Sequence, residues 1–410
     1  MGPLLLLRSG CLLLAAGCAA GAQEAPFTFR GFGTLGVVRS STDEAEFIRD
    51  VAQPKGARRS PDAGLDSRLG LQANLRLGED WEAVVQAVAS RRFDDTFTPD
   101  LTWAFVKWQA AEGLEARAGR LGFDVYLLAD TRNVGYSYLW VRPPAEYFGG
   151  IPITSFEGAD LVLRRPLAGG FGSLKLFGGH AVGRIPSLGT ETFDLKGSPL
   201  MGLHGDLRTG DWGIRLAWAQ LRFRQEFNSQ VDALLTTLRD PAVAALSPTT
   251  PALADELAVT DKWVRYLSLG LSHEQGPLQA QLALSRITSQ TPALPTGHAG
   301  YLLVGYRMGA WTPYLSLAAA KTAGEQRSTG LPAVPFAGLD QGIARILNIN
   351  QNRQRALSLG LRWDFHRNLC LKAQVDALRN QDHATQLWWR SQPSWDGRAT
   401  VASLTLDFVF

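Results

Sequence analysis

Basic side chains at alternate positions are the feature of this sequence that most suggests chemistry. Within segments where polar and apolar residues alternate, the polar positions carry more cations than anions. The cations taken as candidate site residues are Arg68, Arg76, Arg117, Arg164, Arg215 and Arg362, and Lys175, Arg208 and Lys372 share their parity. The acids on the same faces are Asp160, Asp206, Asp364, Asp376 and Asp407. Rings of charged side chains around an aqueous passage select ions by sign, whereas charges on an ordinary wet surface need no function.

Other kinds of chemistry find little support in the sequence. The run GFGTLG, with Gly31, Gly33 and Gly36, matches a dinucleotide-binding motif, but it lies inside an alternating segment with no helix after it. We attribute these small residues to a close approach of neighbouring backbones. Six histidines are scattered without ligand spacing, and there is no G-x-S-x-G motif. We therefore predict no metal, no cofactor and no enzyme.

Residues 1–22 are predicted to be a secretory signal peptide. Arg8 supplies the positive charge, residues 11–20 the apolar region and residues 20–22 the cleavage site, so that the mature chain begins at Gln23. A lipoprotein signal ending at Cys18 is the alternative. Cleavage after Ala22 leaves Cys370 as the only cysteine, which excludes an internal disulfide. The net charge of +3 is too small to indicate a nucleic-acid partner.

The candidate residues lie in segments with an apolar residue at every second position, which is the period of a β-strand. Residues 67–77, SRLGLQANLRL, place leucines on one face and the polar side chains on the other. Residues 355–365 and 368–378 repeat this pattern. No long amphipathic helix is recognisable, and no apolar run of transmembrane length occurs beyond the N-terminus.

Short and long connections alternate along the chain. Short turns occur near residues 78, 110, 168, 209, 274, 308 and 366, and long loops span roughly 39–66, 92–100, 122–157, 182–198, 224–262, 289–298, 322–354 and 380–398. These fifteen connections predict sixteen strands. Alternating short turns and long loops are typical of membrane barrels, in which lipid covers the apolar faces and closure pairs every strand edge. We therefore predict one all-β domain over residues 23–410, an antiparallel transmembrane β-barrel of about sixteen strands.

Aromatic residues near the strand ends suggest two girdles at the membrane interfaces. Those at the turn ends are Trp81, Trp212, Trp311, Trp363, Phe365 and Phe408, and those at the loop ends are Trp263, Tyr266 and Tyr301. The alternation changes phase after Trp218, where Leu221 and Phe223 take the other parity. A β-bulge, or a strand that leaves the membrane there, would explain the change.

The last residues, TVASLTLDFVF (400–410), alternate as far as Phe410, and we expect this strand to close the barrel against residues 27–38. In this respect the chain resembles the Gram-negative outer-membrane porins of the general-diffusion kind. The resemblance implies that Phe408 and Phe410 form the signal read by the barrel-insertion machinery, and that the protein is a homotrimer. It also implies that residues 122–157, whose PAEYFGG run is similar to the Pro-Glu-Phe-Gly-Gly of porins, fold inward as a constriction loop.

These observations predict an outer-membrane channel for the passive diffusion of small hydrophilic solutes and ions. The predicted constriction loop carries Asp124, Asp130, Arg132, Arg142 and Glu146, so its own charge does not decide ion selectivity. The wall arginines would give a modest anion preference, which should fall when Arg117 and Arg164 are neutralised. A substrate-selective anion or carboxylate channel is the alternative within this class. From another class, a surface adhesin or structural barrel would suit the long loops at 224–262 and 322–354.

Overall fold

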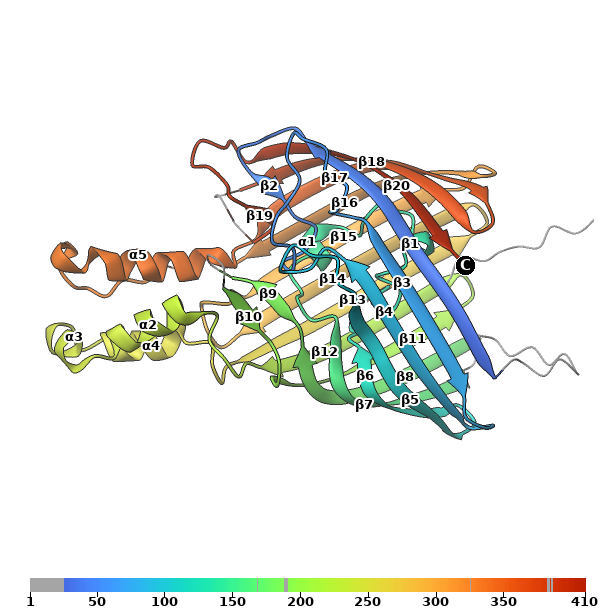
Figure 1. Cartoon of the computed structure of the whole chain (residues 1–410), viewed down its shortest axis with the longest axis horizontal. Coiled ribbons are helices and arrows are strands. Elements are labelled where there is room, and N and C mark those ends of the chain that lie inside the picture. Colours follow the sequence, from blue (N-terminus) through green and yellow to red (C-terminus); the bar gives the residue numbers. More distant parts are fainter. Residues whose placement is uncertain (1–25, 168, 188–190, 325, 382–383, 385) are drawn as a thin grey trace, which may run out of the picture.

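The computed structural model describes residues 26–410 except 168, 188–190, 325, 382–383 and 385, so the predicted signal peptide lies outside the described residues. Sixteen strands form a closed antiparallel barrel in chain order (Figure 1). They are β1 (Phe27–Ser40), β3 (Arg68–Arg76), β4 (Trp81–Ser90), β5 (Asp100–Ala111), β6 (Leu114–Gly122), β7 (Ser155–Leu167), β8 (Gly170–Val182), β11 (Pro199–Thr209), β12 (Trp212–Arg222), β13 (Trp263–Gln275), β14 (Leu278–Ser289), β15 (Gly297–Tyr306), β16 (Trp311–Thr322), β17 (Arg353–His366), β18 (Leu369–Asn380) and β20 (Arg398–Val409). The predicted fold class and strand number are confirmed.

Smaller elements lie in the long connections between these strands. β2 (Glu46–Phe47) pairs with β19 (Trp388–Trp389), and β9 (Arg184–Pro186) pairs with β10 (Thr192–Asp194). A short 3-10 helix, η1 (Gly135–Ser137), and one helical turn, α1 (Ala145–Phe148), lie between β6 and β7. These two elements belong to the loop that resembles the porin constriction loop.

Four helices that the sequence analysis did not recognise project beyond the barrel at its loop end (Figure 1). α2 (Ser229–Leu238), α3 (Pro241–Leu246) and α4 (Thr250–Leu257) connect β12 to β13, and α5 (Ala333–Ile349) lies between β16 and β17. The Asn228 side chain accepts a hydrogen bond from the backbone amide of Val231, and Asp240 caps α3 in the same way. We call α2–α5 the helical extension.

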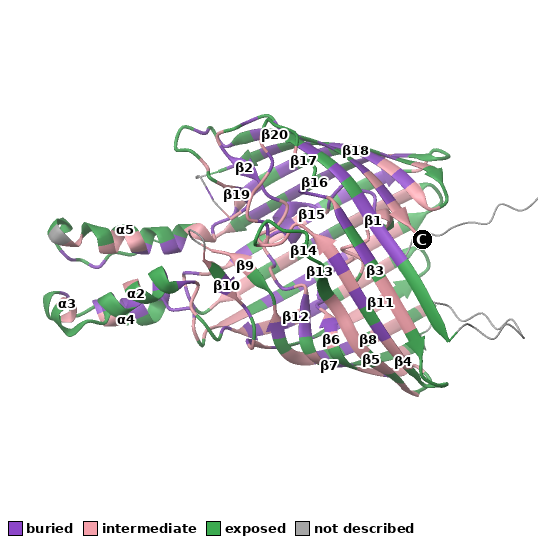
Figure 2. Cartoon of the chain, viewed as in Figure 1, coloured by how far each residue is buried: buried purple, intermediate pink, exposed green. Residues whose placement is uncertain are grey.

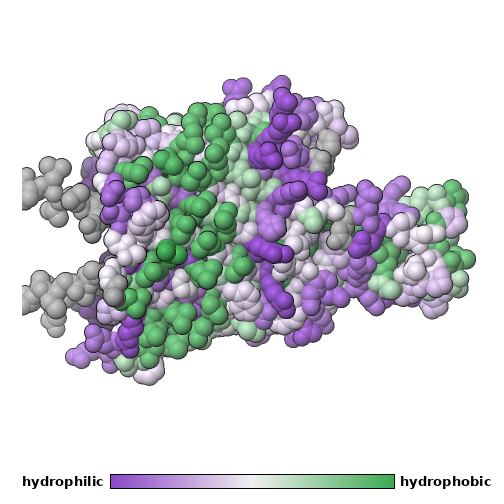
Figure 3. Space-filling view, turned by 180° about the vertical axis from the view of Figure 1, so that it is seen from behind, coloured by the Kyte–Doolittle hydropathy of each residue, from purple (hydrophilic) through white to green (hydrophobic). Residues whose placement is uncertain are grey.

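The side chains of the barrel strands alternate between lipid and interior as predicted. On β17, Leu357, Leu359 and Leu361 are exposed on the outer face, whereas Ser358 and Arg362 are buried inside. Figure 2 shows this alternation along the strands. Figure 3 shows that outward apolar side chains gather in a band across the visible face of the barrel, with more hydrophilic surface toward the loops. A band of this kind is stable only against lipid.

The two predicted aromatic girdles differ in outcome. At the turn end, Trp81 stacks on Trp108 and Trp311 stacks on Trp363, and all four rings are exposed on the outer face. At the loop end, the prediction for Tyr266 and Tyr301 was wrong, because these side chains are buried inside the barrel at 8% and 2% exposure. Both belong to the inward parity of their strands, which brings them against the loop that folds inside.

The barrel closes where β20 pairs with β1 through Phe32↔Val409 to Ser40↔Val401. The rings of Phe408 and Phe410 lie over Gly33 and Gly31, so that a Cβ atom on either glycine would come within 2.3 Å of a ring carbon. The GFGTLG run is therefore explained by aromatic rings that cover glycines across the seam, in place of the backbone approach that we expected.

No bulge occurs at the phase change in β12. Its register with β11 and β13 is regular through Leu221, and Ala217, Ala219 and Leu221 all point inward. The predicted bulge is therefore wrong, and the interior is apolar at the loop end of this strand. The alternative, a strand that leaves the membrane there, stays a prediction. None of the described helices is long and apolar enough to cross a membrane.

Candidate functional site

The connection between β6 and β7, residues 123–154, folds into the barrel, and we call it the inner loop. Its first part is held to one wall by hydrogen bonds to backbone and side-chain oxygens. Lys175 Nζ lies 2.7 Å from Asp124 Oδ1, and Arg215 Nη1 donates to the Tyr126 carbonyl at 3.0 Å. Ser268 Oγ donates to the Val125 carbonyl at 2.6 Å. Three neighbouring regions of the wall, on β8, β12 and β13, thus fix the start of the loop.

The middle of the inner loop is held to the opposite part of the wall by two cations. Arg362 Nη1 donates to the carbonyls of Tyr136 and Tyr138 at 2.8 and 3.0 Å. Lys372 Nζ donates to those of Gly135 and Trp140 at 2.6 and 2.8 Å. Charged donors form strong hydrogen bonds with backbone carbonyls, so these two cations hold the loop backbone directly.

Arg142 is the most connected side chain of the inner loop. Only 2% of it is exposed, and it forms ion pairs of 2.9 Å with Asp66 and with Asp376, as well as a hydrogen bond to Ser403. These partners lie in the first long loop, on β18 and on β20, respectively. Arg142 therefore joins the inner loop to the wall close to the closing seam.

Glu146 lies in α1, where it accepts a hydrogen bond from Gln354 Nε2 at 2.6 Å. Burial raises the pKa of the Glu146 carboxyl above its ordinary value, while the hydrogen bond from Gln354 acts in the opposite direction. Nearby, Tyr147 and Phe148 pack edge-on against Tyr126 and contact Tyr301. Arg142 and Glu146 are thus buried anchors of the inner loop. We expected both side chains to line the open passage, and this expectation was wrong.

Several predicted wall arginines are paired with acids. Arg117 contacts Asp160 at 2.6 Å, Arg215 contacts Asp206 at 2.6 Å, and Arg362 contacts Asp364 at 2.7 Å. Arg164 contacts Glu115 at 3.1 Å near the short turns, and Arg76 ends β3 at the same side of the barrel. The structure therefore does not bring Arg76 and Arg164 to the inner loop, contrary to our expectation.

A cavity of about 380 Å³ lies between the inner loop, the first long loop and the loop ends of β3–β7. Among its described lining residues, the acids are Asp50, Asp100, Glu157 and Asp194, whereas the bases are Arg49, Arg68, Arg91, Arg92, Arg120, Arg132, Arg184 and Lys196. We call it the basic cavity. The bases outnumber the acids by two to one, so its field favours anions.

Arg68 and Arg132 supply unneutralised positive charge to the basic cavity at the inner loop. Arg68 Nη1 donates to the Arg132 carbonyl at 3.3 Å, and its Nη2 is buried without a hydrogen-bond partner. Arg132 Nη1 donates to the neutral Tyr126 hydroxyl at 2.8 Å. In the described part of the chain, no carboxylate forms an ion pair with either guanidinium. Asp130, close by on the inner loop, is exposed.

Sequence reasoning missed several residues that hold the inner loop. Lys175 and Lys372 have the inward parity and were noted as such, but they were not chosen as site residues. His204, also inward, contacts Asp124 at 3.5 Å and Asp206 at 3.0 Å. Asp66 and the loop arginines of the basic cavity carry no periodic signal. No cluster of metal-ligating side chains occurs among the described residues.

Comparison with known proteins gives structural likeness without sequence likeness. No protein-family model and no curated protein sequence matches the chain. OmpT of Vibrio cholerae, in vitro folded and in its trimer form, is similar with a TM-score of 0.55 and 10% identity, over 94% of this chain and 100% of that one. The anion-selective porin of Comamonas acidovorans is similar with a TM-score of 0.54 and 13% identity, over 94% of this chain and 99% of that one. OmpF of Salmonella typhi in complex with daunomycin is similar with a TM-score of 0.54 and 12% identity, over 94% of this chain and 97% of that one. The chain therefore has the fold of the Gram-negative outer-membrane porins.

Proposed function

We propose that the protein is a porin of the Gram-negative outer membrane, which passes small hydrophilic solutes and ions by passive diffusion with a modest preference for anions. The observation that carries this proposal is the inner loop, which is fixed across the barrel interior beside the basic cavity. A loop held by Lys175, Arg215, Arg362 and Lys372 narrows the passage to a constant shape. Ions then pass the inner loop through the basic cavity beside it.

The anion preference is assigned to Arg68 and Arg132. Arg117 and Arg164, to which we first attributed it, are each paired with an acid and contribute little net field. Charges in a narrow interior are screened less than charges on an open surface, where the Debye length is about 8 Å at physiological salt. The preference should therefore be strongest at low salt. The anion-selective porin with the same fold supports this assignment.

The reversal potential of single channels in planar bilayers under a salt gradient tests the proposal. We expect the sign of the reversal potential to indicate anion selectivity. The reversal potential should move toward zero in the variants Arg132→Gln and Arg68→Gln. Arg164→Gln is the matched control, since it removes a guanidinium at the other end of the barrel and should leave the potential unchanged. Clear cation selectivity of the unmodified protein would overturn the assignment, and the absence of conductance would overturn the porin function itself.

The same proposal includes a homotrimer in the outer membrane, inserted by the barrel-insertion machinery and surrounded by its lipid. The trimer form of the similar OmpT structure supports the oligomeric state. Mass measurement of the protein released from native membranes distinguishes a trimer from a monomer.

A second candidate function, binding of partners at the cell surface as an adhesin, is favoured by the helical extension. α2–α5 project beyond the barrel rim, and Val334 and Leu246 are largely exposed there. Deletion of α2–α4 separates the two candidates, because a porin keeps its conductance whereas an adhesin loses its attachment to surfaces.

A further inference from the structure

Three arginines lie side by side on the outer face of the barrel, at the loop ends of β17, β18 and β20. Arg355 lies directly opposite Arg379 in the register of β17 and β18, and Arg379 lies directly opposite Arg398 in that of β18 and β20. All three side chains are exposed and have the outward parity of their strands. We call them the arginine row.

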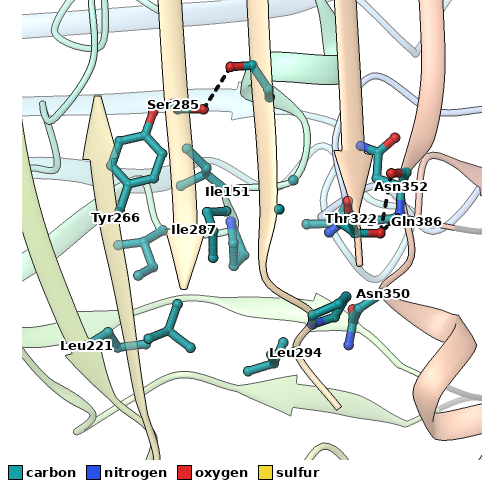
Figure 4. Close-up of a pocket in the computed structure, with 18 of the residues that line it drawn as sticks. Ile151, Leu221, Tyr266, Ser285, Ile287, Leu294, Thr322, Asn350, Asn352 and Gln386 are labelled. Carbon is teal, nitrogen blue, oxygen red and sulfur yellow. Dashed lines mark hydrogen bonds between the residues drawn. The ribbon is translucent and has the colours of Figure 1, made fainter. Parts of the chain in front are cut away.

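The positions of these arginines are fixed by the pairing of the strands. Figure 4 shows Thr322 of β16 beside Asn352, at the point where β17 begins. The Asn352 amide donates to Thr322 Oγ1 at 3.0 Å, and the Thr322 amide donates to the Asn352 carbonyl at 2.8 Å. The register of β18 with both of its neighbours is regular around Arg379. The arginine row is therefore held by the sheet itself, unlike the arginines of the long loops.

Nothing in the described part of the chain neutralises the arginine row. No carboxylate there forms an ion pair with any of its three guanidinium groups. Asp396, the acid nearest to Arg398 in the sequence, accepts a hydrogen bond from the Arg398 backbone amide at 2.9 Å. Like charges that face each other across neighbouring strands are destabilising. An anion between the guanidinium groups would reverse this effect, and phosphate does so with paired hydrogen bonds.

The height of the arginine row matches the edge of the membrane. Trp363, in the aromatic girdle at the turn end, lies on β17 as Arg355 does. At about 3.4 Å per residue and a strand tilt of about 40°, these two residues are about 21 Å apart along the barrel axis. The apolar band of an outer-membrane barrel is about 25 Å tall. The row thus lies where the hydrocarbon ends and the lipid headgroups begin, on the loop side.

The outward side chains next to the arginine row, toward the turns, are apolar or small. The next two cross-strand lines are Leu357, Ala377 and Thr400, and Leu359, Val375 and Ala402. All six side chains are exposed on the outer face. Acyl chains can therefore pack on the same strands whose arginines contact the headgroup. A free anion would use the arginines but not this second surface, so the combination favours a lipid.

We propose that the arginine row binds the phosphate groups of lipids in the leaflet on the loop side of the membrane, with the acyl chains over the two lines beside it. Neighbouring strands are about 4.8 Å apart, so adjacent arginines can reach the same phosphate group. The whole row suits a headgroup with more than one negative charge. This site depends on the barrel in its membrane and goes beyond diffusion through the channel.

Native mass spectrometry of the whole protein in neutral detergent tests the proposal with two lipids of identical chains. Dioleoyl phosphatidic acid carries a phosphate monoester, whereas the headgroup of dioleoyl phosphatidylcholine has no net charge. We expect phosphatidic acid to bind more tightly than phosphatidylcholine by at least about tenfold, which is the effect of one charge-assisted hydrogen bond. Inorganic phosphate at the same concentration should not displace it.

Arg379→Gln should remove most of this preference, because Arg379 lies between the other two arginines. The triple variant Arg355→Gln, Arg379→Gln, Arg398→Gln should remove all of it. Arg265→Gln is the matched control and should change nothing. Arg265 is also exposed at the loop end of its strand, but it faces only neutral residues on β12 and β14.

Thermal unfolding of the same samples shows whether the variants fold. Without phosphatidic acid, the triple variant should be at least as stable as the unmodified protein, because the repulsion within the row is gone. Phosphatidic acid should raise the thermal midpoint of the unmodified protein and leave that of the triple variant unchanged.

Equal binding of the two lipids, unchanged binding of phosphatidic acid by the folded triple variant, or its displacement by inorganic phosphate would overturn the proposal. Dissociation of an oligomer in the triple variant, without a change in lipid binding, would also overturn it and would assign the row to an interface between copies of the chain. Conductance is recorded on the same samples and should be equal in all variants, so that failure of this site is distinguished from failure of the porin function.

Discussion

The Asp124 and Glu146 carboxyl groups of the inner loop lie in opposite electrostatic environments. Burial alone would raise the pKa of Asp124, but Lys175 and His204 hold it well below the ordinary value. Glu146 has no cation within ion-pair distance among its described neighbours, and burial raises its pKa. The loop is therefore held by a charged carboxylate at its start and by a carboxyl near its end that is more stable when neutral.

Glu146→Gln should flatten the dependence of stability on pH. Because the pKa of Glu146 is raised in the folded protein, its protonated form stabilises the fold below the ordinary value of 4.5, and this stabilisation is lost as the pH rises through the raised pKa. Glutamine stays neutral and still accepts from Gln354. We expect the thermal midpoint of the variant at pH 8 to equal or exceed that of the unmodified protein. If the thermal midpoint fell from pH 5 to pH 8 by the same amount in the variant and in the unmodified protein, Glu146 would not be the cause of the pH dependence.

Removing the Arg142 guanidinium should release the inner loop. Arg142→Met leaves Asp66 and Asp376 buried without their common cation, and breaking a buried ion pair in this way costs about 3–5 kcal/mol. Arg164→Met removes a half-buried pair near the turns and should cost less than about 1 kcal/mol. Urea unfolding followed by the intrinsic tryptophan fluorescence measures both. Equal midpoints would show that Arg142 is not an anchor.

The strands were predictable from sequence, whereas the loops were predictable only in order. Period-two alternation gives each strand a parity, and it correctly placed Leu359 outside and Arg362 inside. It could not say what an inward side chain meets, so Tyr266 was taken for an interfacial residue when the inner loop in fact covers it. Similarly, Arg142 and Glu146 were located in the correct loop, but their burial depends on Asp66 and Gln354, which are distant in sequence. The helices of the extension were missed because α3 and α4 are short and because α5 contains Gly338 and Gly342, which have low helix propensity.

The facing of β14 gives a matched test of the predicted parity. Leu282 is exposed on the outer face near the middle of the strand, and Gln281, its neighbour, points into the barrel. Leu282→Arg should therefore destabilise the protein in bilayers by about 2–4 kcal/mol if it lies at the midplane. Gln281→Arg should fold normally and change the conductance. The reverse ranking would mean that the register of β14 is wrong by one residue.

Closure of the whole barrel depends on one seam between strands that are far apart in the chain. Phe410 exchanges backbone hydrogen bonds with Gly31, at 2.8 and 2.9 Å, and its ring covers that glycine. Neither β1 nor β20 has a neighbour on its open edge until this seam forms, and an unpaired strand edge is not tolerated in lipid. The recognition of Phe408 and Phe410 by the insertion machinery stays a prediction beside this structural role.

Phe410→Asp should reduce the yield of assembled barrel far more than a substitution inside the barrel such as Gln281→Arg. The carboxylate cannot cover Gly31 and would place a charge on the outer face. The heat-modifiable fraction on gels measures assembly in cells, and refolding of the same variants into detergent measures closure without the insertion machinery. Normal yield in cells would exclude both roles of Phe410.

The helical extension gives the molecule an external platform that can be altered independently of the barrel. Its helices pack on one another, with Gly342 of α5 beside Leu234 of α2, and Arg327 bonded to Glu256 across the two connections. The regular part of α5 after the kink at Val334, residues 335–349, is about 22 Å long at 1.5 Å per residue. A peptide inserted between Arg239 and Asp240, where α2 gives way to α3, would thus be displayed well clear of the bilayer. The extension is consequently the natural position for an affinity tag or epitope on living cells, because no strand register changes with its length.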